Sequence, residues 1–149
     1  MAVVPERCFI IVVEDNDADF EAFEMLLHDT AVSTDLVRCR SGQEALDLIH
    51  GRTWSKDDRP LHILLDINLP GVNGIEVLRH LRANNTLAAA PVTMLTLSTN
   101  PRDVESCYRA GANSFLAKPS DLERFTNMVN SFVAFWLKAA VLPDPHGVR

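Results

Sequence analysis

The 149-residue sequence has little cysteine, and none of it is spaced in pairs. Its three cysteines, Cys8, Cys39 and Cys107, are odd in number, lie far apart and form no Cys-x-x-Cys motif. Disulfide frameworks and zinc sites both need cysteines at close, repeated spacings. We therefore expect buried free thiols, with neither a disulfide framework nor a zinc site.

Long apolar runs and an excess of basic residues are also absent. The strongly apolar stretches, such as residues 9–13, fall far short of the ~20 residues that span a bilayer, and the N-terminus lacks the layout of a signal peptide. Fourteen Lys and Arg stand against twenty Asp and Glu, a formal net charge of -6, whereas nucleic-acid binding needs a basic face. These absences predict a cytoplasmic protein that binds neither membranes nor nucleic acid.

What remains is the composition of one ordinary globular domain. The sequence is 47% hydrophobic and 23% charged, which is typical of a folded chain, and its length suits a single core. We predict a domain over residues 1–139 and a C-terminal tail at 140–149, a candidate dimer arm that is too short for an output domain.

Short β-branched runs alternate five times with stretches of helical spacing. Strands are expected at residues 8–13, 35–40, 61–66, 91–97 and 114–117, and the helices between and after them end with a helix at about 121–139. The polar segment 51–60, which contains Trp54, is expected to be an extended surface connection. Such alternation predicts an α/β fold: a five-stranded parallel sheet in the flavodoxin-like order 2-1-3-4-5, with helices on both faces.

Acidic residues follow two of these strands. Glu14 and Asp15 follow the first strand and Asp66 the third, and the predicted order brings both strand ends to the point where open parallel sheets bind ligands. Two ionised carboxylates ~5 Å apart repel by roughly 3 kcal/mol at an effective dielectric constant near 20, so the cluster should bind a proton or a cation. Oxygen ligands favour Mg²⁺, which would keep Asp66 anionic and nucleophilic.

Thr96 and Lys118 end the fourth and fifth expected strands. A threonine hydroxyl at this edge could donate a hydrogen bond to a transferred phosphoryl group, and a lysine could pair with its remaining oxygens.

Five motifs in this order resemble the receiver domain of two-component response regulators, over roughly residues 8–138. The motifs are Glu14-Asp15, Asp66, the following Gly74, Thr96 and Lys118-Pro119. The resemblance implies that Asp66 is the phosphoacceptor and that Thr96 and Lys118 contact the phosphoryl group. The implied Mg²⁺ ligands are Asp15, Asp66 and the backbone carbonyl of Asn68, with Glu14 assisting through water. Phe115 holds the position of the aromatic that swings inward when the threonine moves, and the Lys118-Pro119 bond is often cis in the family.

A narrower resemblance is to the stand-alone response regulators of bacterial and cyanobacterial phytochromes. It rests on Glu14-Asp15-Asn16 with Ala18-Asp19, on the long third connection and on the C-terminal apolar residues. It implies that a phytochrome-type kinase could be the partner and that the C-terminal segment makes homodimers. The expected contact residues are Phe135, Trp136, Leu137, Val141 and Leu142. An apolar stripe on both sides of a terminal helix needs a second surface to cover it; the alternative is an arm folded back on its own domain.

The resemblance implies a signalling switch rather than an enzyme: a histidine kinase phosphorylates Asp66, and the phosphorylated protein presents altered contacts. Two alternatives stay open. One is a pseudo-receiver scaffold without phosphotransfer, although the acidic cluster and the lysine are retained. The other is a Mg²⁺-dependent phosphatase with an aspartyl nucleophile, although Asn68 offers no general acid two residues after Asp66.

Other polar residues receive structural interpretations. Asp17 and Asp19 are expected to serve a helix N-terminus, and Ser120 to cap the last helix. Leu97, where receivers often have a small residue, could narrow access to Asp66 and slow phosphoryl turnover. The five histidines share no metal-ligand spacing and are treated as surface or packing residues.

Overall fold

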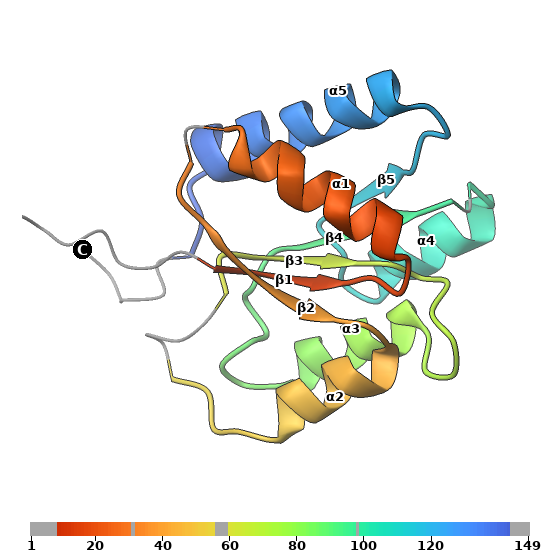
Figure 1. Cartoon of the computed structure of the whole chain (residues 1–149). Coiled ribbons are helices and arrows are strands. Elements are labelled where there is room, and N and C mark those ends of the chain that lie inside the picture. The colour runs from red at the N-terminus through yellow and green to blue at the C-terminus, as the bar shows by residue number, and fades with distance from the viewer. Residues whose placement is uncertain (1–8, 31, 56–59, 98, 144–149) are drawn as a thin grey trace, which may run out of the picture.

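A parallel sheet between two layers of helices forms the fold (Figure 1). The computed structural model describes residues 9–30, 32–55, 60–97 and 99–143. Within these residues the strands are β1 (Phe9–Val13), β2 (Asp35–Cys39), β3 (His62–Leu65), β4 (Val92–Thr96) and β5 (Ser114–Ala117). They pair in the order β2-β1-β3-β4-β5, so the predicted fold class and strand order are confirmed.

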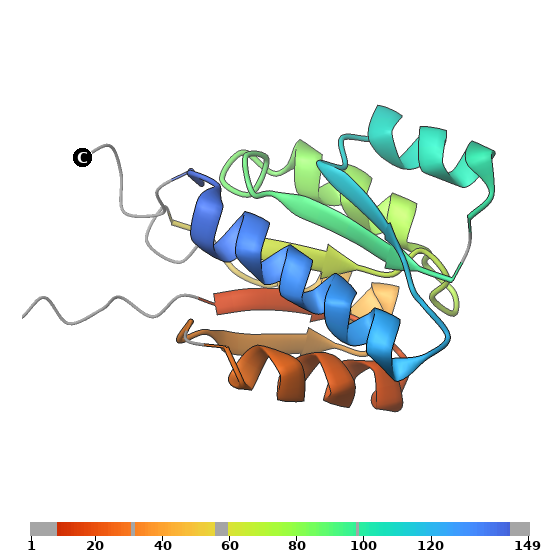
Figure 2. The ribbon, with the colours of Figure 1, turned by 90° about the horizontal axis from the view of Figure 1, so that it is seen from above.

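Helices connect the strands and cover both faces of the sheet. They are α1 (Asp17–His28), α2 (Gly42–His50), α3 (Gly74–Ala83), α4 (Pro101–Arg109) and α5 (Leu122–Phe132), continued by a π-helical segment, η2 (Val133–Ala139). Figure 2 shows α5 running across the sheet on the face that it shares with α1. Phe23 of α1 and Phe132 of α5 meet edge to face, with ring centroids 6.0 Å apart.

Polar side chains set where the helices begin. Asn16 starts α1 by accepting a hydrogen bond from the backbone N–H of Asp19, and Ser41 starts α2 by accepting one from Glu44. The prediction that Ser120 caps the last helix is wrong. Its neighbour Asp121 is the extended cap residue and accepts from the backbone N–H of Arg124.

The last helix differs from the expected regular helix at about 121–139. Its final part, η2, is π-helical, and the N–H of Ala140 donates to the carbonyl of Phe135, five residues earlier. Trp136 of η2 packs on the buried ring of His62 in β3, with centroids 4.7 Å apart. The wider turn is therefore found where the C-terminal segment packs on the sheet.

The segment after α2 is also different from the expectation. Trp54 is only 6% exposed and belongs to the core beneath α2 and α3, so the surface interpretation of 51–60 is wrong at this residue; residues 56–59 lie outside the described part. The indole Nε1 donates to the carbonyl of Ile49, 3.0 Å away, in the last turn of α2. A helix end leaves carbonyls without helical partners, which lets the polar edge of a tryptophan be buried there.

Two of the three cysteines can be placed. Cys39 and Cys107 are free and buried, as expected, while Cys8 lies outside the described residues. In the described part of the chain, no helix has both the length and the apolar character needed to cross a membrane.

Candidate functional site

Three carboxylates meet beyond the carboxyl ends of β1 and β3. Val13 and Leu65 are paired in the parallel register, and the backbone N–H of Asp66 donates to the carbonyl of Val13 at 3.1 Å. Glu14 and Asp66, the next residues, therefore leave the sheet side by side. Carboxylate oxygens of Glu14, Asp15 and Asp66 all lie within 4.8 Å of one another. This is the convergence that the strand order predicts.

Lys118 lies in the middle of this acidic cluster. The pairing of Thr96 with Ala117 places it directly after β5, and its side chain is almost completely buried. The ammonium donates to Glu14 Oε1, to Asp66 Oδ2 at 2.9 Å and to Asp19 Oδ2 at 3.0 Å. One cation thus faces an excess of acids.

Asp19 has a larger role than its expected place at a helix N-terminus. Its carboxylate contacts Lys118, 99 residues later in the chain. The sequence signal was its position in the first turn of a helix that begins at the edge where the acidic residues gather. A connection to the lysine could not be read from that position alone.

Burial and pairing shift the protonation of two groups. Burial raises the pKa of Glu14 to about 7, against the opposing effect of its hydrogen bond and charge interaction with Lys118, while Asp66 raises it further. Burial works to lower the pKa of Lys118, but its hydrogen bonds to Glu14 and Asp66 outweigh this and hold the pKa above its ordinary value. Lys118 therefore stays charged, and Glu14 takes up a proton more readily than an ordinary glutamate.

Asn68 links the acidic cluster to Thr96. Its backbone N–H donates to Asp66 Oδ1 at 3.0 Å, and its side-chain amide donates to the hydroxyl of Thr96, also at 3.0 Å. The sequence assigned Asn68 a metal-binding backbone carbonyl and a side chain that is no general acid, and nothing in its spacing indicated the hydrogen bond to Thr96. The bond holds the fully buried hydroxyl of Thr96 on the Asp66 side of β4.

Gly74 allows the loop after Asp66 to close tightly. A Cβ atom at this position would lie 2.1 Å from the carbonyl oxygen of Asp66, well inside any tolerable contact. The N–H of Gly74 donates to the carbonyl of Ile67 at 3.0 Å. Only glycine fits this approach between the start of α3 and the residue after β3.

The remaining predicted residues lie outside the cluster. Phe115, in β5, is half-buried and packs against the core on the α2, α3 and α4 face. Leu97 follows Thr96 and is exposed. The Lys118–Pro119 bond is trans.

The residues expected at a dimer contact fall into two groups. Phe135 and Val141 are 56% and 99% exposed. Trp136 and Leu137 are half-buried against the core shared by α1 and α5, and Leu142 is half-buried. Part of the C-terminal apolar stripe is thus covered by its own domain.

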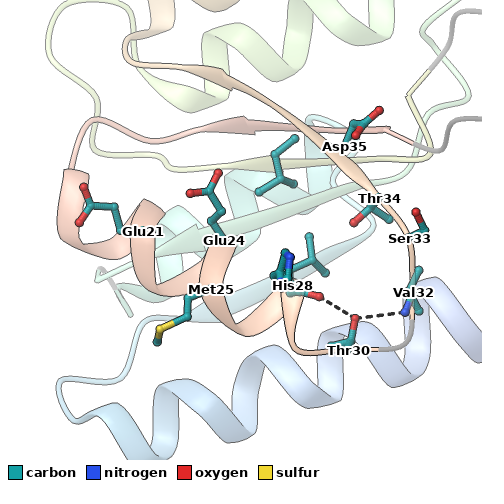
Figure 3. A pocket seen from close by; sticks show the side chains of 11 residues that line it. Glu21, Glu24, Met25, His28, Thr30, Val32, Ser33, Thr34 and Asp35 are labelled. Carbon is teal, nitrogen blue, oxygen red and sulfur yellow. Dashed lines mark hydrogen bonds between the residues drawn. The ribbon is translucent and has the colours of Figure 1, made fainter.

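A separate hollow of about 690 Å³ opens between α1 and the start of β2 (Figure 3). Glu21, Glu24, His28 and Asp35 are among its lining residues. None of the acidic-cluster residues lines this hollow, so the hollow is separate from the candidate phosphorylation site.

Comparison with known proteins decides the family. Residues 10–130 match the response regulator receiver domain. The chain belongs to this family. The resemblance predicted from the motifs is therefore confirmed. Proteins with this domain act in two-component signalling.

The chain is also similar to phytochrome response regulators. Response regulator Rcp1 of Synechocystis sp. is 34% identical over 135 residues, which cover 90% of this chain and 92% of Rcp1. The crystal structure of the Mn²⁺-bound form of Rcp1 superposes with a TM-score of 0.83, covering 91% of this chain and 99% of that one. The phosphorylated cyanobacterial phytochrome response regulator RcpA has a TM-score of 0.84 at 33% identity, covering 92% and 99% of the two chains.

Proposed function

We propose that this receiver domain accepts a phosphoryl group from a histidine kinase on Asp66 and signals through altered protein contacts. One observation carries the proposal: the Asp66 carboxylate is held by Lys118 on one oxygen and by the N–H of Asn68 on the other, beside two further acids. An aspartate in this position is oriented and nearly buried, as a nucleophile should be.

Mg²⁺ would be held by Asp15, Asp66 and the backbone carbonyl of Asn68, with Glu14 assisting. The residues fit such an ion, because the donors are all oxygens and the single ammonium of Lys118 leaves negative charge uncompensated. When bound, Mg²⁺ would supply positive charge to the oxygens of the incoming phosphoryl group. The Mn²⁺-bound form of the related Rcp1 supports this assignment.

The chain's own residues would carry the transfer. A carboxylate oxygen of Asp66 attacks phosphorus, and the bond from phosphorus to the imidazole nitrogen of the kinase breaks. Lys118 then turns part of its hydrogen bonding from Asp66 to a phosphoryl oxygen. The hydroxyl of Thr96, which accepts a hydrogen bond from the amide of Asn68, donates its own proton to another phosphoryl oxygen. The exposed Leu97 narrows the approach of water and slows loss of the phosphoryl group.

Phosphorylation would shift the population toward a second conformation. Inward movement of Thr96 frees space for the side chain of Phe115. Phe115 is half-buried and lies three residues before Lys118 in the chain. The face formed by α4, β5 and α5 would change as a result.

The proposed partners are a phytochrome-type histidine kinase and a second copy of this chain, in the cytoplasm. Similarity to RcpA supports the kinase class. The exposed Phe135 and Val141, with Trp136, Leu137 and Leu142 beside them, would form the contact between copies.

The decisive experiment is phosphorylation in vitro. The protein is incubated with Mg²⁺ and a small phosphodonor, and mass spectrometry locates the modified residue, with Asp66→Asn as the control. We expect one phosphoryl group on Asp66, dependent on Mg²⁺. A label elsewhere, or no label on folded protein that binds Mg²⁺, would contradict the proposal, and the second result would favour the scaffold alternative.

A further inference from the structure

Two exposed histidines from different helices face each other, and neither belongs to the acidic cluster. His50 is the last residue of α2 and His80 lies in the last turn of α3. His50 Nε2 and His80 Nδ1 are 2.8 Å apart, and the ring centroids are 5.0 Å apart. At this distance two neutral rings share one proton between two nitrogens.

The surroundings of the pair favour a cation. The C-terminal end of a helix carries partial negative charge, and here two such ends lie together. Asp47 and Glu76 lie about one turn before His50 and His80 on their own helices, and both are exposed. Arg52, the nearest basic residue after α2, is placed over the ring of Trp54, 4.4 Å from its centroid.

We propose that His50 and His80 form a binding site for a divalent transition-metal ion of the Zn²⁺ or Ni²⁺ class. Imidazole nitrogens bind such ions at ~2.0–2.1 Å, so two of them in one coordination sphere lie about 2.9 Å apart at a right angle and about 3.4 Å apart at a tetrahedral angle. The observed 2.8 Å requires a shift of only tenths of an ångström in exposed side chains. The ion would take the place of the proton between the two nitrogens, the ring that donates it would carry its proton on its other nitrogen instead, and water would complete the coordination.

This site is chemically distinct from the acidic cluster. Mg²⁺ prefers oxygen ligands and binds imidazole poorly, whereas nitrogen ligands favour Zn²⁺ and Ni²⁺. A metal bound to His50 and His80 would also join α2 to α3, so it should raise the stability of the folded state.

The test is a titration with Zn²⁺ alone, in buffer with saturating Mg²⁺ to occupy the acidic cluster. Calorimetry gives the affinity and stoichiometry, NMR follows the histidine ring signals, and thermal unfolding is recorded with and without Zn²⁺. The variants are His50→Gln and His80→Gln. His28→Gln is the matched control, because His28 is an exposed histidine in the last turn of α1.

We expect one Zn²⁺ per chain, with ring shifts at both histidines and a higher melting temperature. Either variant should weaken binding by on the order of tenfold or more, since even loss of an outer-shell partner costs about 10–100-fold. The His28 control should bind as the unmodified protein does. Binding that survives in both variants, or that is lost in Asp66→Asn, would overturn the proposal and assign the ion to another site. No Zn²⁺-dependent change in the ring signals of His50 and His80 would show a proton-sharing pair only, which also overturns it.

Discussion

At the scale of single residues, Lys118 governs the charge of the candidate site. Its ammonium is buried and contacts Glu14, Asp19 and Asp66, which come from three different segments. An ammonium in this place neutralises part of the cluster and also repels any metal ion that binds beside it. Two opposing effects on the same carboxylates therefore depend on one side chain.

Replacing Lys118 with Met should strengthen Mg²⁺ binding while abolishing effective phosphorylation. A divalent ion ~5 Å from an ammonium is repelled by about 1–2 kcal/mol even at the dielectric constant of water, or roughly tenfold in affinity. Calorimetric titration with Mg²⁺ should be repeated at several alkaline pH values, because burial raises the pKa of Glu14 and the variant also loses the Lys118 interactions that lower it. Asp66→Asn, which removes a carboxylate, should weaken binding instead. Weaker Mg²⁺ binding in Lys118→Met would show that the lysine is not a competitor.

Replacing Gly74 with Ala should disturb the site through the backbone. The new methyl would collide with the carbonyl oxygen of Asp66, 2.1 Å away, so the loop has to move. Overpacking of this kind costs about 1–3 kcal/mol. Urea unfolding should show the loss of stability, and the rate of Asp66 phosphorylation should fall with it. Gly71→Ala offers a control for the loop, since no atom lies within 4 Å of the position of its Cβ, although its φ of +73° adds some strain of its own. Equal phosphorylation rates for Gly74→Ala and the unmodified protein would contradict this account.

At the scale of elements, β3 and the C-terminal helical segments are joined through His62. Its ring is fully buried, with Phe132 at 4.9 Å and Trp136 at 4.7 Å between centroids. Nε2 bonds the hydroxyl of Thr93 at 2.7 Å, while Nδ1 has no hydrogen-bond partner among the described residues. Burial lowers the pKa of His62 to about 3. The histidine must therefore stay neutral for α5 and η2 to pack on the sheet.

This packing predicts a loss of stability in mild acid. The unfolded chain binds a proton at His62 near pH 6.5, whereas the folded chain does so only near pH 3. The stabilisation is complete above pH 6.5 and decreases by about 1.4 kcal/mol for each pH unit below it. Urea unfolding between pH 7 and pH 4.5 gives the free energy of unfolding at each pH. Its slope against pH should be smaller for His62→Gln than for the unmodified protein, because the contributions of the carboxyl groups are common to both proteins. Parallel slopes for the two proteins would exclude this origin.

At the scale of the whole molecule, exposed apolar residues lie at the C-terminal end of the α5 and η2 segment. Phe135 and Val141 are exposed, and no described residue of the chain buries them. Trp136 and Leu137 instead pack against the core. A second copy of the chain could cover Phe135 and Val141 without disturbing the packing of Trp136 and Leu137. The proposed homodimer makes this distinction testable.

Phe135→Asp should weaken self-association and leave the fold intact. A charge placed in a buried contact between copies is costly, whereas the same charge on a free surface costs little. Sedimentation velocity over a range of concentrations, with and without phosphorylation, measures the effect. Leu122→Asp is the matched control, because Leu122 is exposed on the same helix at its other end. A dimer that survives Phe135→Asp but not Leu122→Asp would move the contact to the start of α5.

The α/β class, the strand order and the meeting of Glu14, Asp15 and Asp66 could be predicted from the sequence, because apolar periodicity places strands and parallel order aligns their carboxyl ends. The folded chain was needed to find the burial of Trp54, the contact of Asp19 with Lys118, the π-helical segment after α5 and the pairing of His50 with His80. Each of these depends on side-chain packing between elements. The spacing of residues along one helix does not determine how that helix packs against another, so the distances between side chains of two helices are known only from the folded structure.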